Sequence, residues 1–225
     1  NLTPLGHEIF ANDKFIEELG TLYLLQYQLA KQEEEATAWY YFFNVFSMSE
    51  FTREEFVQGL QNYILMSEDA STVAIRSLND DFACIINTYL PRYKSNPGKV
   101  SPENNIDCPF GELGLVDIAN KKQKTYKKTI PAAKSFNPWV IYAVIMDQAD
   151  GRDEVSLNEL LTKPKNIGKV FNFDAITMFD VLHEVENAGL IKIIRTAGLD
   201  VIHLNKQMTF DDCVKKYYET IDEEV

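Results

Sequence analysis

Apolar side chains recur at helical spacing through the first ninety residues of the chain. Leu22, Leu25 and Leu29 fall on one stripe, and the first thirty residues predict helix. A second helix is expected from about Glu34. Aromatic side chains make that helix apolar on every side, which is typical of a helix buried in a core rather than of a ligand site.

Two further helices are predicted between residues 52 and 90. Thr52 and Glu55 have the spacing of a capping box, in which the threonine hydroxyl accepts from the Glu55 amide and the glutamate reaches back to the Thr52 amide. After a polar turn, a longer helix carries an apolar stripe, and Pro91 ends it. The opposite face of that helix is polar and displays Ser71, Thr72, Arg76 and Asn79.

A β-hairpin is expected after these helices. Residues 92–112 form a polar loop in this interpretation, and residues 113–118 form a strand. Residues 119–122 are the expected tip, and residues 123–130 the return strand. The segment 131–136 has the composition of a linker, so we place the main boundary of the chain there.

The second half of the chain repeats the same order of elements. Asn137-Pro138 predicts an N-cap followed by proline at the first helical position. Ser156 and Glu159 have the spacing of a second capping box, and Asp174 is expected to cap a further helix. Residues 190–204 alternate around a turn and predict a second hairpin, after which a short amphipathic helix precedes the acidic end.

The pattern therefore predicts a mainly α protein with small antiparallel β-hairpins, an α+β fold built from tandem winged-helix-like (helix-turn-helix) units. We expect an N-terminal helical region at 1–50, a first winged-helix-like unit at 51–130 and a second at 131–225 that ends in a helix. Residues 2–6 resemble the exit from a wing. We therefore expect a helical, DNA-binding region upstream of them.

Composition agrees with a globular protein of 225 residues, of which 45% are hydrophobic and 25% charged. No apolar run is long enough to span a membrane, and the first residues lack the features of a secretory signal. Three cysteines (Cys84, Cys108 and Cys213) are too few and too far apart for a disulfide framework or a zinc site. These features predict a cytoplasmic protein without a membrane partner.

The charge is unevenly distributed along the chain. The net charge of −12 argues against indiscriminate nucleic-acid binding, but residues 91–134 carry a net charge of +5. Five lysines fall within eight residues around one aromatic side chain: Lys121, Lys122, Lys124, Lys127 and Lys128, with Tyr126. Lysines at this density suit phosphate contacts, and the tyrosine could stack on a base or sugar. The alternative is a solvated turn that only keeps the hairpin soluble.

The polar face of the longer helix is the second predicted DNA contact. Ser71, Thr72, Arg76 and Asn79 would occupy the exposed face of a recognition helix, whereas Asp80 and Asp81 would repel phosphate. No motif predicts catalysis. The sequence has no glycine-rich phosphate loop, no HExxH and no CxxC, and no lysine has an acid two positions before it, as one nuclease core requires. Catalytic residues are therefore unassigned, and no metal site is predicted.

Several motifs together resemble a bacterial family formally described as of unknown function. They follow one another in order over nearly the whole chain and include Leu2-Thr-Pro-Leu-Gly6, Ala36-Thr-Ala-Trp-Tyr40, Thr88-Tyr-Leu-Pro91 and Asp107-Cys-Pro-Phe-Gly-Glu-Leu-Gly-Leu115. Members of that family are encoded in DNA phosphorothioation (Dnd/Ssp-type) and defence islands. One branch, the SspB component, has been described as a DNA nickase. The resemblance implies DNA and other modification-pathway proteins as partners, and it implies that the chain lacks the family's N-terminal region.

Three hypotheses about function follow. The first is a DNA-binding component of a DNA sulfur-modification or related defence pathway. The second is a metal-dependent nicking endonuclease of that pathway, and only this hypothesis requires a cofactor, Mg²⁺. The third is an adaptor that binds other proteins and never touches DNA.

Overall fold

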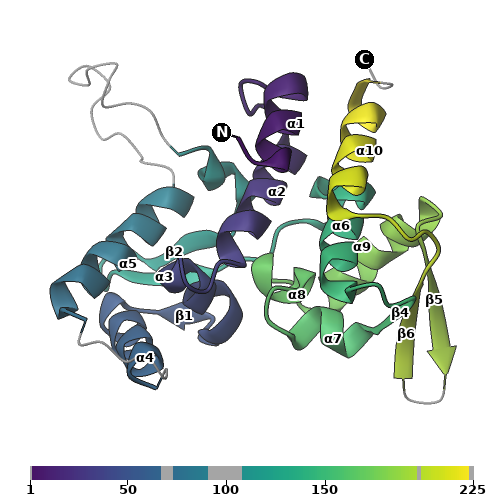
Figure 1. The fold of residues 1–225 in the computed structure, drawn as a ribbon. Helices are drawn as coiled ribbons and strands as arrows, with labels where there is room; N and C mark the ends of the chain where they lie inside the picture. Colours follow the sequence, from purple (N-terminus) through teal and green to yellow (C-terminus); the bar gives the residue numbers. More distant parts are fainter. Residues whose placement is uncertain (1, 67–72, 91–107, 197–198, 223–225) are drawn as a thin grey trace. The chain divides into compact units, whose positions relative to one another are not determined.

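The computed structural model describes residues 2–66, 73–90, 108–196 and 199–222. Backbone contacts divide the chain into two compact units. The central unit comprises residues 32–129, and the terminal unit comprises residues 1–31 together with 130–225. Figure 1 shows the elements of both units. Whether residues 1–50, 51–130 and 131–225 fold as separate domains stays a prediction.

The central unit combines helices with one small sheet. Its elements in chain order are α3 (Thr37–Tyr40), a π-helical turn (Tyr41–Val45), β1 (Glu50–Phe51), α4 (Arg53–Leu65), α5 (Ile75–Tyr89), a 3₁₀ turn (Pro109–Leu113), β2 (Val116–Asn120) and β3 (Thr125–Lys128). The predicted aromatic helix lies in the core of this unit, where Phe42 and Phe43 are buried and contact each other edge to face.

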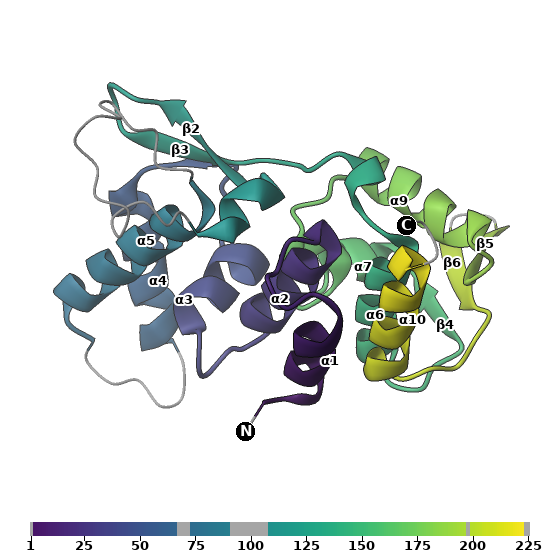
Figure 2. The same cartoon turned by 90° about the horizontal axis from the view of Figure 1, so that it is seen from above.

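The terminal unit has more helices and a second small sheet. Its elements are α1 (Pro4–Asn12), α2 (Leu19–Ala30), α6 (Pro138–Ala149), β4 (Glu154–Ser156), α7 (Leu157–Thr162), α8 (Ile167–Val170), α9 (Ala175–Asn187), β5 (Ile191–Thr196), β6 (Leu199–Leu204) and α10 (Phe210–Asp222). Helix α6 is the centre of this unit because eight of its twelve residues are buried. Helix α10 runs alongside it (Figure 2).

The two sheets have the same connectivity. In the central unit the strand order is β1-β3-β2, and in the terminal unit it is β4-β6-β5, with all neighbours antiparallel. Each sheet begins with a short strand, continues through helices and ends in a hairpin. The mixed α+β fold is thus confirmed. The first strand of each sheet was missed by the sequence pattern, because two or three residues are too few to show alternation.

Helix starts agree closely with the predicted caps. The Thr52 hydroxyl accepts the Glu55 amide, and the Glu55 carboxylate accepts the Thr52 amide, which completes the capping box. The Ser156 hydroxyl accepts the Glu159 amide at 3.1 Å, and the Asp174 carboxylate caps α9. The predicted continuous helix over the first thirty residues is wrong. It is interrupted after α1, where the Asp13 carboxylate accepts two later backbone amides.

Candidate nucleic-acid interface

The basic hairpin of the central unit is formed by β2 and β3. Its tip consists of residues 121–124, two residues later than the sequence pattern predicts. The Asn120 side chain fixes this turn because its Oδ1 accepts the amides of Lys122, at 2.9 Å, and of Gln123, at 3.2 Å. Lys124 closes the turn in the left-handed region, at φ 53°.

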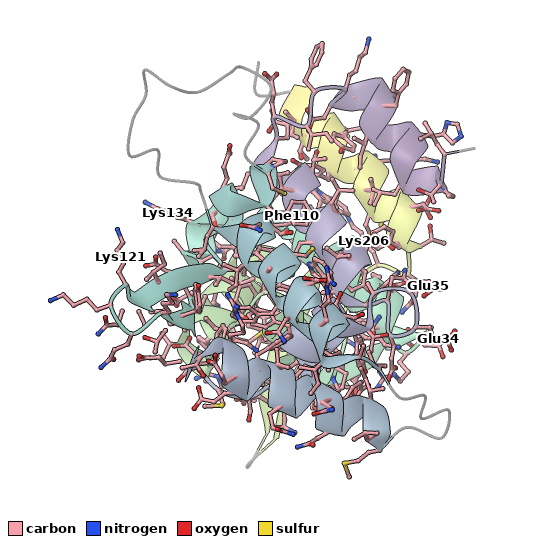
Figure 3. The ribbon with its side chains drawn as sticks, turned by 90° about the vertical axis from the view of Figure 1, so that its left-hand side faces the viewer. Glu34, Glu35, Phe110, Lys121, Lys134 and Lys206 are labelled. Carbon is pink, nitrogen blue, oxygen red and sulfur yellow. The ribbon has the colours of Figure 1, made fainter. Side chains whose placement is uncertain are left out.

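Three lysines at this turn are exposed: Lys121, Lys122 and Lys124, which we call the basic tip. Figure 3 shows Lys121 pointing away from the unit, on the side opposite Glu34 and Glu35. The two glutamates and the basic tip therefore lie at separate edges of the central unit. A polyanion could contact the tip without meeting those two glutamates.

The other two lysines of the hairpin have different surroundings. Lys127 lies on the outer face of β3, half-buried, and its Nζ is 3.7 Å from the Asp117 carboxylate. Lys128 points inward, where its Nζ donates to the carbonyl oxygens of Phe42, at 2.5 Å, and Phe46, at 2.6 Å. The same ammonium lies 4.8 Å from the Phe42 ring centre. Lys128 thus anchors the hairpin to the end of the π-helical turn.

Tyr126 also anchors the hairpin. Its ring is stacked near Phe51, with centroids 6.2 Å apart, and meets Phe82 of α5 edge to face at 5.6 Å. The side chain is half-buried. This packing fixes the hairpin against α5 and holds the basic tip at a defined place beside that helix.

A small polar hollow lies between the basic tip and the start of α4. Arg53, Glu54, Gln123, Lys124 and Tyr126 line it. The hollow brings together two cationic side chains, Arg53 and Lys124, that are 71 positions apart in the sequence. With Glu54 also in the lining, it has the character of an anion site with one competing carboxylate. Sequence reasoning missed Arg53 because only the strand pairing of β1 with β3 brings the start of α4 next to the hairpin.

The predicted recognition-helix residues are only partly described. Ser71 and Thr72 lie outside the described residues. Arg76 is exposed on the first turn of α5, and Asn79 lies on the same face one turn later, with its Nδ2 donating to the Ile75 carbonyl at 2.8 Å. Burial, with Asp80 adding its negative charge, raises the pKa of Asp81.

Among the described residues, no three His, Cys, Asp or Glu side chains are grouped closely enough to hold a metal ion. His183 and His203 each lie beside a single glutamate, at 3.4 and 3.6 Å. Burial raises the pKa of the Cys213 thiol to about 12, which keeps it protonated and unreactive at neutral pH.

Across the described ranges, none of the helices combines the length and apolar character that a membrane span requires.

Comparisons with known proteins identify the fold and the family. The structure is similar to magnesium ion-bound SspB, with a TM-score of 0.77 and 23% identity over 93% of this chain and 63% of that one. It is also similar to a second SspB crystal structure, with a TM-score of 0.74 and 22% identity over 95% of this chain and 62% of that one. This chain therefore spans less than two thirds of the length of either SspB chain. No curated protein sequence matches it. The model of the family described as "Protein of unknown function (DUF4007)" matches residues 1–218, and the chain belongs to that family.

Proposed function

We propose that this chain is a DNA-binding component of a DNA phosphorothioation or related defence pathway. The fold it shares with SspB supports the pathway. The observation that carries the DNA-binding part is the basic tip, which exposes three lysines on a chain with a net charge of −12. Other proteins of the same pathway are the further partners in this proposal.

Both units support a winged-helix interpretation. In that fold a helix, a short strand, two helices and a hairpin follow one another, and the last strand lies between the other two. The strand orders β1-β3-β2 and β4-β6-β5 have this form. In the central unit α5 would then be the recognition helix, with Arg76 and Asn79 directed to the DNA, and β2 and β3 would be the wing.

The wing contacts the phosphate backbone in this proposal. Lys121, Lys122 and Lys124 neutralise phosphates and release counterions, which favours binding without reading sequence. The hollow between Lys124 and Arg53 would take one phosphate. Tyr126, Lys127 and Lys128 act mainly by holding the wing in place, since two of them are packed against the core and Lys127 is close to Asp117.

A salt titration of duplex DNA binding tests this proposal. Replacement of Lys121, Lys122 and Lys124 by alanine should flatten the slope of log K against log salt by roughly 2–3, at about 0.9 per phosphate contact. The matched control removes three exposed lysines from the terminal unit (Lys192, Lys206 and Lys215). The control has the same net charge and should retain most of the slope. If both variants lose the same amount, the basic tip is not the contact surface.

If neither variant changes the affinity or the slope, the hairpin is a solvated turn. The adaptor hypothesis would then take the place of DNA binding.

A change at Arg76 separates base reading from phosphate binding. Arg76→Ala should cost about 1–3 kcal/mol and relax discrimination at one base pair, if the side chain reads a base edge.

The nicking hypothesis rests on one observation, the shared fold with magnesium ion-bound SspB. In the part of the chain that the structure describes, no three His, Cys, Asp or Glu side chains are grouped closely enough to hold a metal ion. We therefore assign no catalytic step to this chain. Incubation with supercoiled plasmid, with and without Mg²⁺, tests for nicking. Magnesium-dependent conversion to open circles would support it, and an unchanged plasmid would remove it.

A further inference from the structure

The hairpin-bearing side of the terminal unit contains an apolar groove. A hollow of about 310 Å³ lies between the start of α9 and the end of β5, and we call it the α9 groove. Its lining residues are Ala175, Ile176, Phe179, Asp180 and Arg195. Ile176 is 73% exposed at its edge. A single exposed isoleucine is ordinary on a protein surface, but this one borders a hollow with an aromatic ring.

Neighbouring groups hold the walls of the groove in place. The Phe179 ring has the His183 ring at its edge, with centroids 4.4 Å apart, and the Arg195 guanidinium 4.6 Å from its centre. The Ile193 amide of β5 donates to the Glu186 carboxylate of α9 at 2.8 Å. The groove is therefore largely preformed, and a ligand would lose little free energy in ordering it.

Helix α9, which forms one wall of the groove, carries acids and no lysine or arginine. Asp180 and Glu184 are exposed on α9, and so is its N-cap Asp174, whose pKa is lowered by the capping bond from the Thr177 amide. Arg195 is the cation among the lining residues, and its guanidinium lies against the Phe179 ring. A ligand that matches this surface places a bulky apolar side chain in the hollow and positive charges beside the acidic helix.

We propose that the α9 groove docks an amphipathic segment of a partner protein, in which one bulky apolar side chain is flanked by lysines or arginines. DNA fits this surface poorly, because exposed carboxylates of α9 would meet the phosphates. A second copy of this chain is also a poor match through its basic tip. The sequence Lys121-Lys-Gln-Lys124 contains no apolar side chain to fill the hollow.

The test uses synthetic peptides and the full chain. The probe is a fluorescent helical peptide with one central leucine flanked by lysines on an alanine background. One matched peptide has alanine in place of the leucine, and another has glutamates in place of the lysines. Anisotropy at physiological salt gives the dissociation constants. We expect the leucine–lysine peptide to bind and both matched peptides to bind at least about tenfold more weakly.

Two protein variants localise the binding. Ile176→Asp should weaken the leucine–lysine peptide by about 30-fold, as expected when the anchor of a small interface is lost. An acid is tolerated at the exposed second position of α9, since it favours the helix dipole there. The control is Ile75→Asp, because Ile75 is 58% exposed on the first turn of α5. It adds the same charge and should leave the affinity unchanged.

Several outcomes would overturn the proposal. Equal binding of the leucine and alanine peptides would show attraction by charge alone, and equal losses in the two protein variants would place the site elsewhere. No detectable binding of the leucine–lysine peptide would likewise reject it. Sedimentation that shows a dimer dissociated by Ile176→Asp would make the groove a contact between copies. Loss of duplex binding in Ile176→Asp, with peptide binding intact, would make it a DNA contact. The basic tip is not involved in these readouts, so DNA binding can fail or succeed independently.

Discussion

The hairpin of the central unit and that of the terminal unit follow the same connectivity but carry different chemistry. Beside α5, the exposed groups include the three lysines of the basic tip and Arg76. Beside α9, they include acids, Ile176 and Arg195 around an aromatic ring. The same strand order therefore carries a cluster of exposed lysines in one unit and an apolar groove in the other. Connectivity alone does not determine function, which resides in the side chains that each scaffold displays.

The helices that precede each hairpin differ as well. In the central unit α4 is followed by α5 along the chain, whereas the terminal unit inserts the short helix α8 between α7 and α9. This insertion brings the backbones of α7 and α8 very close together. A Cβ on Gly168 would lie 2.4 Å from the Leu161 carbonyl oxygen. A Cβ added to Gly59, in the middle of α4, would instead come closest to the hydroxyl at the far end of the Tyr41 side chain.

The first prediction, which has the largest expected effect, tests this difference between Gly168 and Gly59. Gly168→Ala should destabilise the protein by about 3 kcal/mol, at the upper end for overpacking, because a backbone cannot move aside. Gly59→Ala should change stability by less than about 1 kcal/mol, since the Tyr41 ring can shift and alanine favours the helix. Urea unfolding of both variants checks this. Similar losses at the two sites would show that α7 and α8 can separate easily.

The second prediction concerns the two kinds of lysine in the basic hairpin. Lys128→Ala should destabilise the protein by about 2 kcal/mol, because the Phe42 and Phe46 carbonyls lose a charged donor. Lys121→Ala, at the exposed tip, should change stability by less than about 0.5 kcal/mol. Lys128→Met retains the apolar stem over the rings and separates the hydrogen bonds from packing. Thermal unfolding gives all three values, and equal stabilities for Lys128→Ala and Lys121→Ala would contradict the anchoring role.

Sequence reasoning predicted the local features of this fold better than its long-range ones. The caps at Thr52, Ser156 and Asp174 were predictable because each depends on residues three positions apart. The inward direction of Lys128 could not be predicted from the sequence. It depends on the pairing of β3 with β1, which places residue 128 near carbonyls more than eighty positions away. A charge cluster in a sequence therefore does not reveal which of its members are exposed.

The groove of the terminal unit was missed for the same reason. Phe179 of α9 is only half-buried and lines the hollow with Arg195. Arg195 is brought there by the packing of β5 against α9. Within the sequence, the useful signal was Ile176. An isoleucine two residues after a helix cap, outside the stripe formed by Met178, Val181 and Val185, marks an apolar side chain without a place in the core.

The third prediction concerns Glu159, which is the third residue of α7, as Glu55 is the third residue of α4. Glu159 accepts bonds from the Arg152 guanidinium, at 2.6 and 3.0 Å, and from Lys163, at 3.1 Å. The Arg152 bonds are the main cause that lowers the pKa of this carboxyl to about 2 from an ordinary 4.5. Because the folded pKa is lowered, the stabilisation is complete above pH 4.5 and is lost as the pH falls towards 2.

Glu159→Gln should remove this pH dependence and cost about 1 kcal/mol at neutral pH, after allowance for solvent around the partners. Urea titrations of both proteins between the two pKa values measure the effect. The curves should converge at the acidic end. Parallel curves would mean that the ion pairs do not distinguish the folded from the unfolded chain.

The last prediction, which has the smallest expected effect, compares the helix caps at Thr52 and Ser156. Thr52→Ala and Ser156→Ala should each cost about 1 kcal/mol, because each removes a hydroxyl that accepts a helix-start amide. The partner acids should respond differently. Glu55 accepts the Thr52 amide at 2.7 Å and the Thr52 hydroxyl at 2.9 Å, whereas the Glu159 carboxylate is bonded to Arg152 and Lys163.

Double-mutant cycles measure that difference directly. The Thr52 and Glu55 substitutions to alanine should be non-additive, since each residue is the other's partner. The Ser156→Ala and Glu159→Gln substitutions should be nearly additive, because the Ser156 hydroxyl accepts from the Glu159 backbone, which glutamine leaves in place. Coupling of equal size in the two cycles would show that both units have the same reciprocal cap in solution. The difference between the caps would then disappear, while the contrast between the basic tip and the α9 groove would remain, because neither surface includes a capping hydroxyl.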